Sequence, residues 1–263
     1  MTLHVTRTGT GPTLVLLHGL GVSSWMWDDQ VAALSDRFGC VTVDLPGSGV
    51  SHARPWTSLA ATADEVAGIV ADISPDGAAH VVGLSMGGYV ALALLAAHPD
   101  RVHSAVVSGV TTGPLSPAWL YRPLTRLGVR MMRRPAAVRA SARMMRIPAE
   151  ATALMLTDAA RLSPAAANGL YTELMDGYRT PGLGAAAQRL LAVAGDGEVR
   201  PVRAGLADLA ALGATTAVVP RAHHAWNAEH PELFSRTVAD WALHRTLPPE
   251  LAAAGAASAT GGR

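Results

Sequence analysis

The segment from residue 78 to residue 99 constrains the fold more than any other part of the chain. An apolar run ending in VVGL passes directly into Gly83-Leu84-Ser85-Met86-Gly87-Gly88, and an amphipathic helical pattern follows. A strand that meets a helix this abruptly needs a sharp turn, and the glycines around Ser85 let backbone and helix approach without a clash. Such a turn presents the serine hydroxyl above the sheet. We therefore predict Ser85 as a nucleophile; the alternative is a glycine-rich turn with an idle serine.

Apolar strand patterns alternate with helical patterns along most of the chain. The strand patterns are residues 3–7 and 13–17, followed by CVTVDL, AAHVVGL, VHSAVVSG, RLLAVAG and TTAVVP. Because these strands are apolar along their length, both faces of their sheet must be covered, which is typical of parallel strands joined by helices. The sequence therefore predicts an α/β protein with a mostly parallel sheet flanked by helices.

This alternation is interrupted once. Residues 112–185 contain only helical or irregular patterns, which predicts an inserted helical cap, with residues 1–111 and 186–246 forming the core. Residues 247–263 are rich in Ala, Gly and Ser without apolar periodicity, which predicts a flexible C-terminal tail. A chain of 263 residues is long enough for one catalytic domain that carries such an insertion.

Composition excludes several classes of function. The chain is 49% hydrophobic and 16% charged, which favours a packed globular protein. Lys and Arg (21) nearly balance Asp and Glu (20), so no overall basic surface for nucleic acid is expected. The single cysteine, Cys40, excludes an intramolecular disulfide and a cysteine metal cluster. The sequence shows neither a secretory signal nor an apolar stretch long enough to span a bilayer, so we expect a cytoplasmic protein that does not act at a membrane.

A serine hydroxyl is a weak nucleophile, so it needs a base within hydrogen-bond reach and an acid that orients the base. In chains with a serine turn of this kind, the three residues follow one another in the order serine, acid, histidine, and the histidine lies in a loop after a late strand. His223 and His224, directly after TTAVVP, satisfy that placement. The candidate acids after RLLAVAG are Asp196 and Glu198. We prefer Glu198, because its position clears the strand end, and keep Asp196 as the alternative acid or a cap of the turn.

Catalysis also needs N–H donors for the negative charge that develops on the substrate oxygen. The backbone N–H of Met86, at the start of its helix, is one candidate, and the N–H of Leu20, in the loop after TLVLL, is the other. We interpret His18, at the end of the same strand, as a structural hydrogen-bonding residue rather than a second base. Such a site requires neither a metal nor an organic cofactor.

The segments that carry these residues resemble the α/β-hydrolase family over nearly all of the first 245 residues. They are LVLLHGLGVSSWMWDDQ, VTVDLPGSGVS, VVGLSMGGYVALALLAAHPDRV, LAVAGDGEV and VVPRAHHAWNAEHPELFSRTVADW. The resemblance implies an eight-stranded, mostly parallel sheet with a Ser, acid, His triad at the strands' C-terminal edge. It also implies Ser85 as the nucleophile and the N–H groups of Leu20 and Met86 as the oxyanion hole. His224 matches the base, because the family's histidine commonly precedes a small residue and then an aromatic one.

Two positions qualify this resemblance. Many family members carry aspartate where this chain has Glu198, so the choice between Glu198 and Asp196 stays open. A serine at position 85 argues against the haloalkane dehalogenase and epoxide hydrolase branches, which need a carboxylate nucleophile.

The predicted cap is rich in arginine and in large apolar side chains. Residues 119–147 contain no acidic residue but include Arg122, Arg126, Arg130, Arg133, Arg134, Arg139, Arg143 and Arg146. This charge would attract a carboxylate, a coenzyme A thioester or an acidic carrier protein, although a solvated arginine face is the simpler interpretation. Trp119 and Tyr121, together with Trp25, are predicted to line the substrate pocket. The cap methionines suit either an adaptable pocket or the core of the cap: Met131, Met132, Met144, Met145 and Met155.

The sequence therefore predicts hydrolysis of an ester, thioester or lactone with a mainly apolar acyl group, through an acyl-enzyme on Ser85. The expected partner is a small-molecule substrate. If the arginines of the cap bind an anionic group, an acidic carrier protein or a coenzyme A thioester is expected as well. The same site would also serve carbon–carbon bond hydrolysis, perhydrolysis, or biosynthetic acyl transfer and cyclisation, because fold and triad do not fix the chemistry. A non-catalytic ligand-binding or scaffold protein is the alternative from another class.

Overall fold

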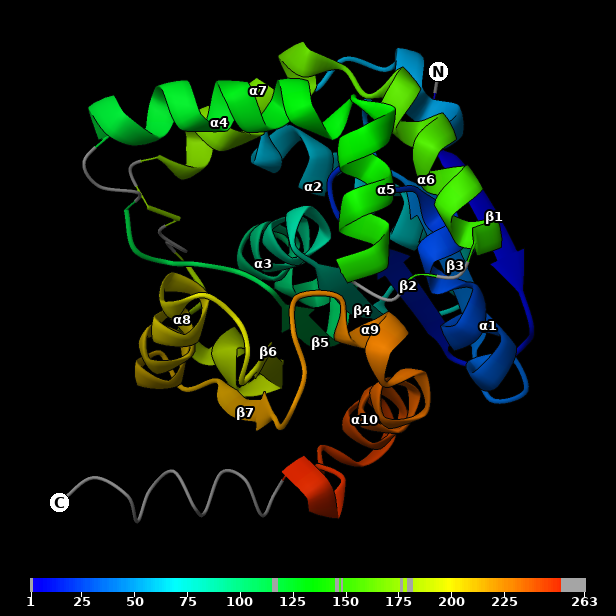
Figure 1. Ribbon diagram of the computed structural model, residues 1–263. Helices are drawn as coiled ribbons and strands as arrows, with labels where there is room; N and C mark the ends of the chain where they lie inside the picture. The colour runs from blue at the N-terminus through cyan, green and yellow to red at the C-terminus, as the bar shows by residue number, and fades with distance from the viewer. Residues whose placement is uncertain are drawn as a thin grey trace, which may run out of the picture.

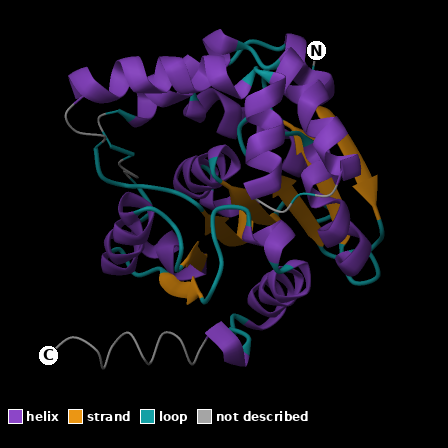
Figure 2. Ribbon diagram, in the orientation of Figure 1, coloured by secondary structure: helices purple, strands orange, loops and turns teal. Residues whose placement is uncertain are grey.

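The computed structural model describes residues 2–114, 118–144, 147, 149–175, 177–178 and 182–251. One sheet crosses the molecule, with helices on both of its faces (Figures 1 and 2). A further group of helices, green to yellow-green in Figure 1, lies above one edge of this sheet. The molecule therefore has a three-layered core with a helical cap.

The sheet contains seven strands within the described residues, where the family resemblance implied eight. They are β1 (His4–Thr8), β2 (Thr13–Leu17), β3 (Gly39–Asp44), β4 (Ala79–Leu84), β5 (Val102–Ser108), β6 (Leu190–Gly195) and β7 (Thr215–Val219). Their order is β1-β3-β2-β4-β5-β6-β7, in which β1 runs antiparallel to β3 and every other neighbouring pair is parallel. Each strand corresponds to one apolar run of the sequence, and the described residues offer no eighth run of this kind. The strand count is therefore corrected to seven.

Helices connect these strands. The α-helices of the core are α1 (Asp28–Leu34), α2 (Leu59–Ile73), α3 (Met86–Ala97), α8 (Arg200–Ala211), α9 (Trp226–Glu229) and α10 (Pro231–His244). Short 3-10 helices are η1 (Ser24–Trp27), η2 (Gly49–Ala53), η3 (Pro99–Arg101) and η4 (Gly184–Arg189). No helix in the described part of the chain is long and apolar enough to cross a membrane.

Each apolar strand supports two cores, because successive side chains of a strand point to opposite faces of the sheet. On one face Val15 and Leu17 of β2 pack with α2, α3 and α8. On the other face Leu14 and Leu16 pack with α1 and α10. A shift of the register by one residue would move these buried side chains to the opposite face, so the register of each strand is fixed. Since the neighbouring strands β2 to β7 are parallel, their carboxyl ends lie together at one edge of the sheet.

The insertion between β5 and β6 forms the cap. It contains α4 (Ala118–Met132), α5 (Pro135–Met144), α6 (Ala149–Arg161) and α7 (Pro164–Leu174). A small apolar cluster of Val129, Leu162 and Ala167 packs α4 against α7 and the residue that follows α6, and the side chain of Leu20 from the core packs against it. The cap therefore contacts the loop that follows β2, directly above the strand ends.

The segment predicted as a flexible tail begins inside the packed core. Leu251 is fully buried in the same apolar cluster as α10, and Arg236 pairs with Glu250 at 2.6 Å. The boundary predicted at residue 247 is therefore corrected to a point after Leu251, because this side chain completes the packing on that face. Residues 252–263 of the predicted tail lie outside the described residues.

Leu251→Ala is expected to lower the free energy of unfolding by about 2 to 5 kcal/mol, because it removes a fully buried side chain and leaves a cavity. Leu243→Ala, at a position on α10 that is 39% exposed, should cost about 0.5 kcal/mol or less. Chemical denaturation of the two variants measures the difference. Equal stabilities would show that the residues after α10 do not contribute to the core.

Candidate active site

Ser85 occupies the turn between β4 and α3, where its backbone is held in an unusual conformation. Its φ of 55° and ψ of −116° lie outside the regions that residues with a Cβ ordinarily adopt. The Ser85 N–H donates to the Ser108 carbonyl at 2.8 Å, and the Gly87 N–H donates to the His18 carbonyl at 3.0 Å. A Cβ on Gly87 would lie 2.0 Å from the Leu17 carbonyl oxygen, so only glycine fits there. The ends of β2, β4 and β5 together fix this turn.

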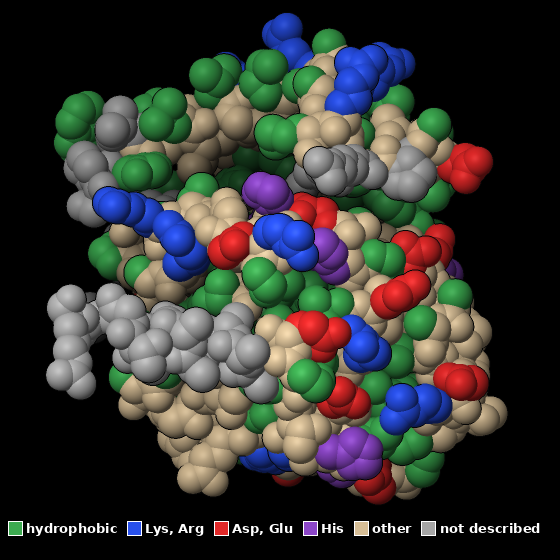
Figure 3. Space-filling model, turned by 60° about the horizontal axis from the view of Figure 1, so that its bottom comes forward, with side chains coloured by type: hydrophobic (Ala, Val, Ile, Leu, Met, Phe, Trp, Pro, Cys, Tyr) green, Lys and Arg blue, Asp and Glu red, His purple; other side chains and the backbone are tan. Residues whose placement is uncertain are grey.

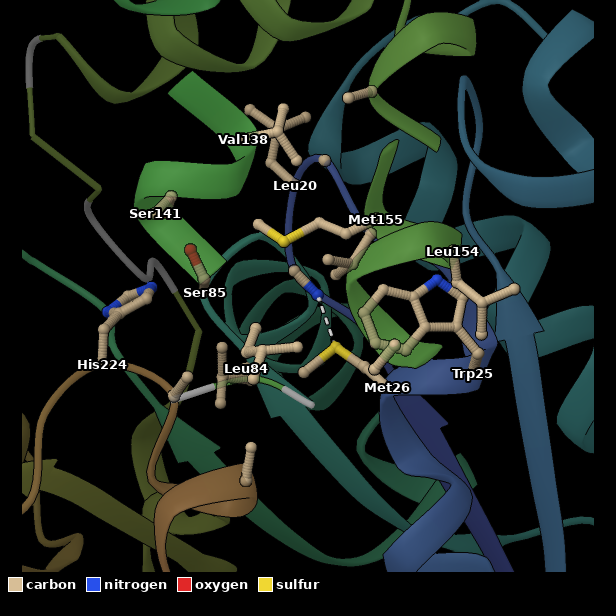
Figure 4. A pocket seen from close by; sticks show the side chains of 18 of the residues that line it. Leu20, Trp25, Met26, Leu84, Ser85, Val138, Ser141, Leu154, Met155 and His224 are labelled. Atoms are coloured by element: carbon tan, nitrogen blue, oxygen red, sulfur yellow. Dashed lines mark hydrogen bonds between the residues drawn. The ribbon is translucent and has the colours of Figure 1, made fainter. Parts of the chain in front are cut away.

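His224 follows β7 and lines the same pocket as Ser85 (Figure 4). Its Nδ1 is 3.0 Å from Oε1 of Glu198, whose side chain is only 4% exposed. A buried carboxylate at this distance keeps the proton on Nδ1 and leaves the Nε2 lone pair free to accept another. Ser85 and His224, both described residues, form no hydrogen bond with each other, and catalytic hydrogen bonds often tighten only when substrate binds.

The other candidates from the sequence lie away from the pocket. The side chain of His223 is 69% exposed, and its Nδ1 lies 3.1 Å from Oε2 of Glu229. Asp196 is exposed, and its Oδ1 accepts a backbone N–H from the loop after β7 at 3.2 Å. Of the two histidines and two acids, the structure brings only His224 and Glu198 together. Their loops follow the neighbouring strands β7 and β6.

Gly109, directly after β5, makes room for the His224 imidazole. Its φ of +70° favours glycine, and a Cβ at this position would lie 2.6 Å from Cε1 of His224. Two residues after His224, the fully buried Trp226 donates its Nε1–H to Ser108 Oγ at 2.8 Å. The position of the imidazole is therefore set by the end of β5 as well as by Glu198.

The backbone N–H groups of Leu20 and Met86 donate to no other residue in the described part of the chain. Leu20 lines the pocket, whereas Met86, next to Ser85, is buried and is not among the lining residues, so its role as a donor stays a prediction. His18 beneath them is fully buried, and this burial lowers its imidazole pKa. Neutral His18 donates Nδ1–H to the Gly19 carbonyl at 2.8 Å and accepts the Leu45 N–H on Nε2 at 3.0 Å. His18 thus supports the loop that carries Leu20.

Ser85 and His224 open into a cavity of about 580 Å³ between the cap and the core. Hydrophobic side chains follow the hollow beneath the cap in Figure 3, and Figure 4 shows several of them around Ser85. The large apolar side chains of the lining are Leu20, Val22, Trp25, Met26, Leu84, Met131, Met132, Val138, Ile147, Leu154 and Met155. A cavity of this size and character suits a small, mainly apolar ligand.

Trp25 lines this cavity, but Trp119 and Tyr121 do not, which corrects the sequence prediction for these two residues. Trp119 precedes the lining residue Gly128 on α4 by nine residues, or two and a half turns, so it lies on the opposite side of the helix and is 76% exposed. Tyr121 shares the side of Gly128 but lies two turns away, about 10 Å along the helix.

The positive charge of the first half of the cap lies outside the cavity. The described arginines of its first half are all exposed and none lines the cavity: Arg122, Arg126, Arg130, Arg133, Arg134, Arg139 and Arg143. Met144 is exposed as well, while Met145 and Arg146 lie outside the described residues. Besides His224, the ionisable side chains that line the cavity are Asp28, Asp29 and Glu150. Burial and the nearby Asp29 raise the pKa of the Asp28 carboxyl.

Sequence reasoning missed two residues that bear on this site, Gly109 and Asp158. A glycine directly after a strand often marks a close approach of another group, and that signal was available for Gly109. The helical pattern around Asp158 gives no sign of the hydrogen bonds that this residue makes to Ser23 and Trp25. Within the described residues, no group of three or more His, Cys, Asp or Glu side chains is placed to hold a metal ion.

Glu198→Gln is expected to slow labelling of Ser85 by a fluorophosphonate by about a hundredfold or more, because glutamine no longer fixes the proton on Nδ1 of His224. Asp196→Asn should stay within about threefold of the wild-type rate, because Asp196 contacts a backbone N–H away from the pocket. Intact mass spectrometry over time measures both rates. A larger loss in Asp196→Asn would assign the acid to Asp196 instead.

Residues 12–159, more than half of the chain, match the family described as alpha/beta hydrolase fold. The pimeloyl-[acyl-carrier protein] methyl ester esterase of Nitrosomonas europaea is 41% identical over 109 residues, which are 41% of this chain and 41% of that protein. The 2-(acetamidomethylene)succinate hydrolase of Mesorhizobium japonicum is 34% identical over 113 residues, which are 42% of this chain and 40% of that protein. The matched segments thus span about two fifths of the length of these curated relatives.

The likeness to solved structures extends further along the chain. The enol-lactonase from Burkholderia xenovorans LB400 superposes with a TM-score of 0.73 at 26% identity, covering 91% of this chain and 95% of that chain. A thermophilic esterase from Thermogutta terrifontis gives a TM-score of 0.71 at 24% identity, covering 91% and 92%, and shows the shared fold. Together with the matched family, these findings show that the chain belongs to the alpha/beta hydrolase fold family.

Proposed function

We propose that this chain is a serine hydrolase that cleaves an ester, thioester or lactone with a neutral, mainly apolar acyl group. One observation carries the proposal: Ser85, on its strained turn, opens into the same apolar cavity as His224, whose Nδ1 is oriented by the buried Glu198. These are the parts that acyl transfer to a serine requires. The names of the relatives, an ester esterase and a lactonase among them, support the same class of reaction.

In this mechanism His224 Nε2 takes the proton of the Ser85 hydroxyl as Oγ attacks the substrate carbonyl carbon. The Leu20 and Met86 N–H groups stabilise the negative charge that forms on the carbonyl oxygen. As the tetrahedral intermediate collapses, the bond to the leaving group breaks and His224 returns the proton to it. Water then attacks the acyl-enzyme by the same path, and Glu198 stabilises the imidazolium in both steps.

The lining of the cavity favours a neutral acyl group. Methionine and leucine side chains adapt to chains of different shape, and they surround the space beyond Ser85. The acidic lining residues Asp28, Asp29 and Glu150 would repel a carboxylate at the far end of an acyl chain. The acyl chain is therefore expected to end in an apolar or esterified group.

Wild-type enzyme is expected to hydrolyse the p-nitrophenyl ester of hexanoic acid with a kcat/KM at least about tenfold higher than that of the p-nitrophenyl monoester of adipic acid, whose free carboxylate would face the acidic residues. Asp29→Asn should narrow this ratio, and Ser85→Ala should hydrolyse neither ester. Equal kcat/KM values for the two esters would show that the acidic lining residues do not select against a charged acyl group. No turnover of either ester, with no fluorophosphonate label on Ser85, would instead support a non-catalytic ligand-binding protein.

A carrier-bound acyl substrate is a second candidate, and the outer face of the cap supports it. The seven exposed arginines of residues 122–143 form no ion pair with any described residue. An acidic carrier protein would be attracted to this face while its acyl chain enters the cavity below. The relative from Nitrosomonas europaea is named for a methyl ester on an acyl-carrier protein, and a methyl ester is a neutral group.

Reversing the charge of Arg130, Arg133 and Arg134 to glutamate is expected to lower kcat/KM for a carrier-linked methyl ester by about tenfold or more, because exposed interface charges act mainly on the association rate. Hydrolysis of the free methyl ester with the same acyl chain should stay within about twofold, since none of the three arginines lines the cavity. Steady-state kinetics with both substrates measures the contrast. If neither substrate is affected, the carrier proposal fails.

A further inference from the structure

The loop after β2, residues 18–25, is in contact with the cap along most of its length, and we call it the oxyanion loop. The side chain of Leu20 packs against the cap cluster of Val129, Leu162 and Ala167. A Cβ on Gly21 would lie 2.8 Å from the Met132 Cε of α4. The residue that offers one of the two oxyanion donors is therefore in direct contact with the inserted helices.

Asp158 on α6 makes the polar part of this contact. It is only 8% exposed, and its Oδ2 accepts the Ser23 Oγ–H at 2.8 Å and the Trp25 Nε1–H at 2.6 Å. Trp25 and Leu154, which lies one turn before Asp158 on α6, both line the cavity on the side away from His224 (Figure 4). One cap carboxylate thus holds both ends of a three-residue stretch of the oxyanion loop.

The core holds the same loop at other points. The Ser24 N–H donates to Oδ1 of the buried Asp44 at 2.9 Å, and the Gly19 N–H lies 3.4 Å from the Met26 Sδ, the dashed contact in Figure 4. These contacts hold the loop at Gly19 and at Ser24, and residues 20–23 lie between them. The side chains of Ser23 and Trp25, in contrast, donate hydrogen bonds to the cap.

The chemistry of Asp158 suits holding rather than catalysis. Its side chain is buried, and it forms no ion pair with any arginine or histidine in the described part of the chain. Hydrogen bonds to a buried carboxylate are short and strong, and a donor left without such a partner is costly. A negative charge near the Leu20 N–H would oppose an oxyanion rather than stabilise it. Asp158 therefore contributes to the site through the loop residues that it binds.

We propose that Asp158 is a positioning residue that ties the oxyanion loop to the cap, so that the Leu20 N–H is in place only while the cap is seated over the substrate. This inference rests on the proposed function, because it concerns the oxyanion hole of that reaction. Its consequence is that a displaced cap lowers the rate of acyl transfer as well as opening the cavity. Enclosure of the substrate and formation of the oxyanion hole become one event.

Asp158→Ala tests this, because the Ser23 Oγ–H and the Trp25 Nε1–H both donate to the same oxygen, Oδ2, and alanine removes that acceptor for both. With p-nitrophenyl hexanoate we expect kcat to fall by about tenfold to a hundredfold while KM changes by less than about threefold, since the lost interaction acts in the transition state. Thr157→Ala, at the exposed neighbouring position of α6, should keep the wild-type kcat. Titration of active sites with a fluorophosphonate corrects each rate for the folded fraction.

The inhibition constant of a hexyl trifluoromethyl ketone distinguishes a role in the oxyanion hole from a role in the stability of the fold alone. This inhibitor forms a tetrahedral adduct with a catalytic serine and needs the oxyanion donors, whereas hexanol occupies only the cavity. In Asp158→Ala the inhibition constant of the ketone should rise in parallel with the loss in kcat, and that of hexanol should not. Ser23→Ala removes the same contact from the core side and should act in the same direction, even if cap variants fold poorly.

The double variant Ser23→Ala with Asp158→Ala should lose no more than about twofold beyond the loss in Asp158→Ala alone, because that change already breaks the Ser23 bond. Additive losses, a raised KM with unchanged kcat, or a ketone constant that stays at the wild-type value would each overturn the inference while wild-type turnover still supports the proposed function. Absence of wild-type turnover and of Ser85 labelling would overturn the proposed function and this inference with it.

Discussion

The close contact between α3 and the ends of β2, β4 and β5 is the constraint on which the rest of the structure depends. Ser85 keeps a positive φ that costs about 1 to 3 kcal/mol, and it does so because strand ends on both sides bind the turn. Gly87 is pressed against the Leu17 carbonyl, so α3 cannot retreat from the sheet without breaking this arrangement. The strain is sustained by two apolar cores that fix the strands from both faces. That packing places Ser85 at the wall of the cavity.

The other polar groups of the site lie at the same edge of the sheet as Ser85, because the strands that precede them are parallel. Glu198 and His224 follow β6 and β7, and the Gly109 backbone at the end of β5 shapes the space for the imidazole. Each group is fixed by a contact to a strand other than its own. The geometry of the site therefore depends on the order of the strands, and no single segment of the chain would form it alone.

The cap divides the charges of the molecule between two environments. Its arginines face outward, while the cavity beneath it is apolar with an acidic rim formed from both cap and core. This separation lets the outer surface attract an anionic partner while the interior favours a neutral acyl group. Asp158 connects the cap to the oxyanion loop through its hydrogen bonds to Ser23 and Trp25. The helices that cover the cavity therefore also contact the loop that contains Leu20.

Much of this could be read from the sequence, because its signals are local. Apolar runs predicted the seven strands, and the abrupt strand-to-helix turn singled out Ser85. The sequence favoured Glu198 over Asp196 and His224 over His223, but only contacts between residues 26 positions apart show which acid and which histidine lie together. Trp119 was misplaced because the sequence does not say which side of α4 faces the cavity. Asp158 meets Ser23 across 135 residues, and only tertiary packing brings such groups together, since hydrophobic periodicity reports which face of an element is buried but not what lies opposite it.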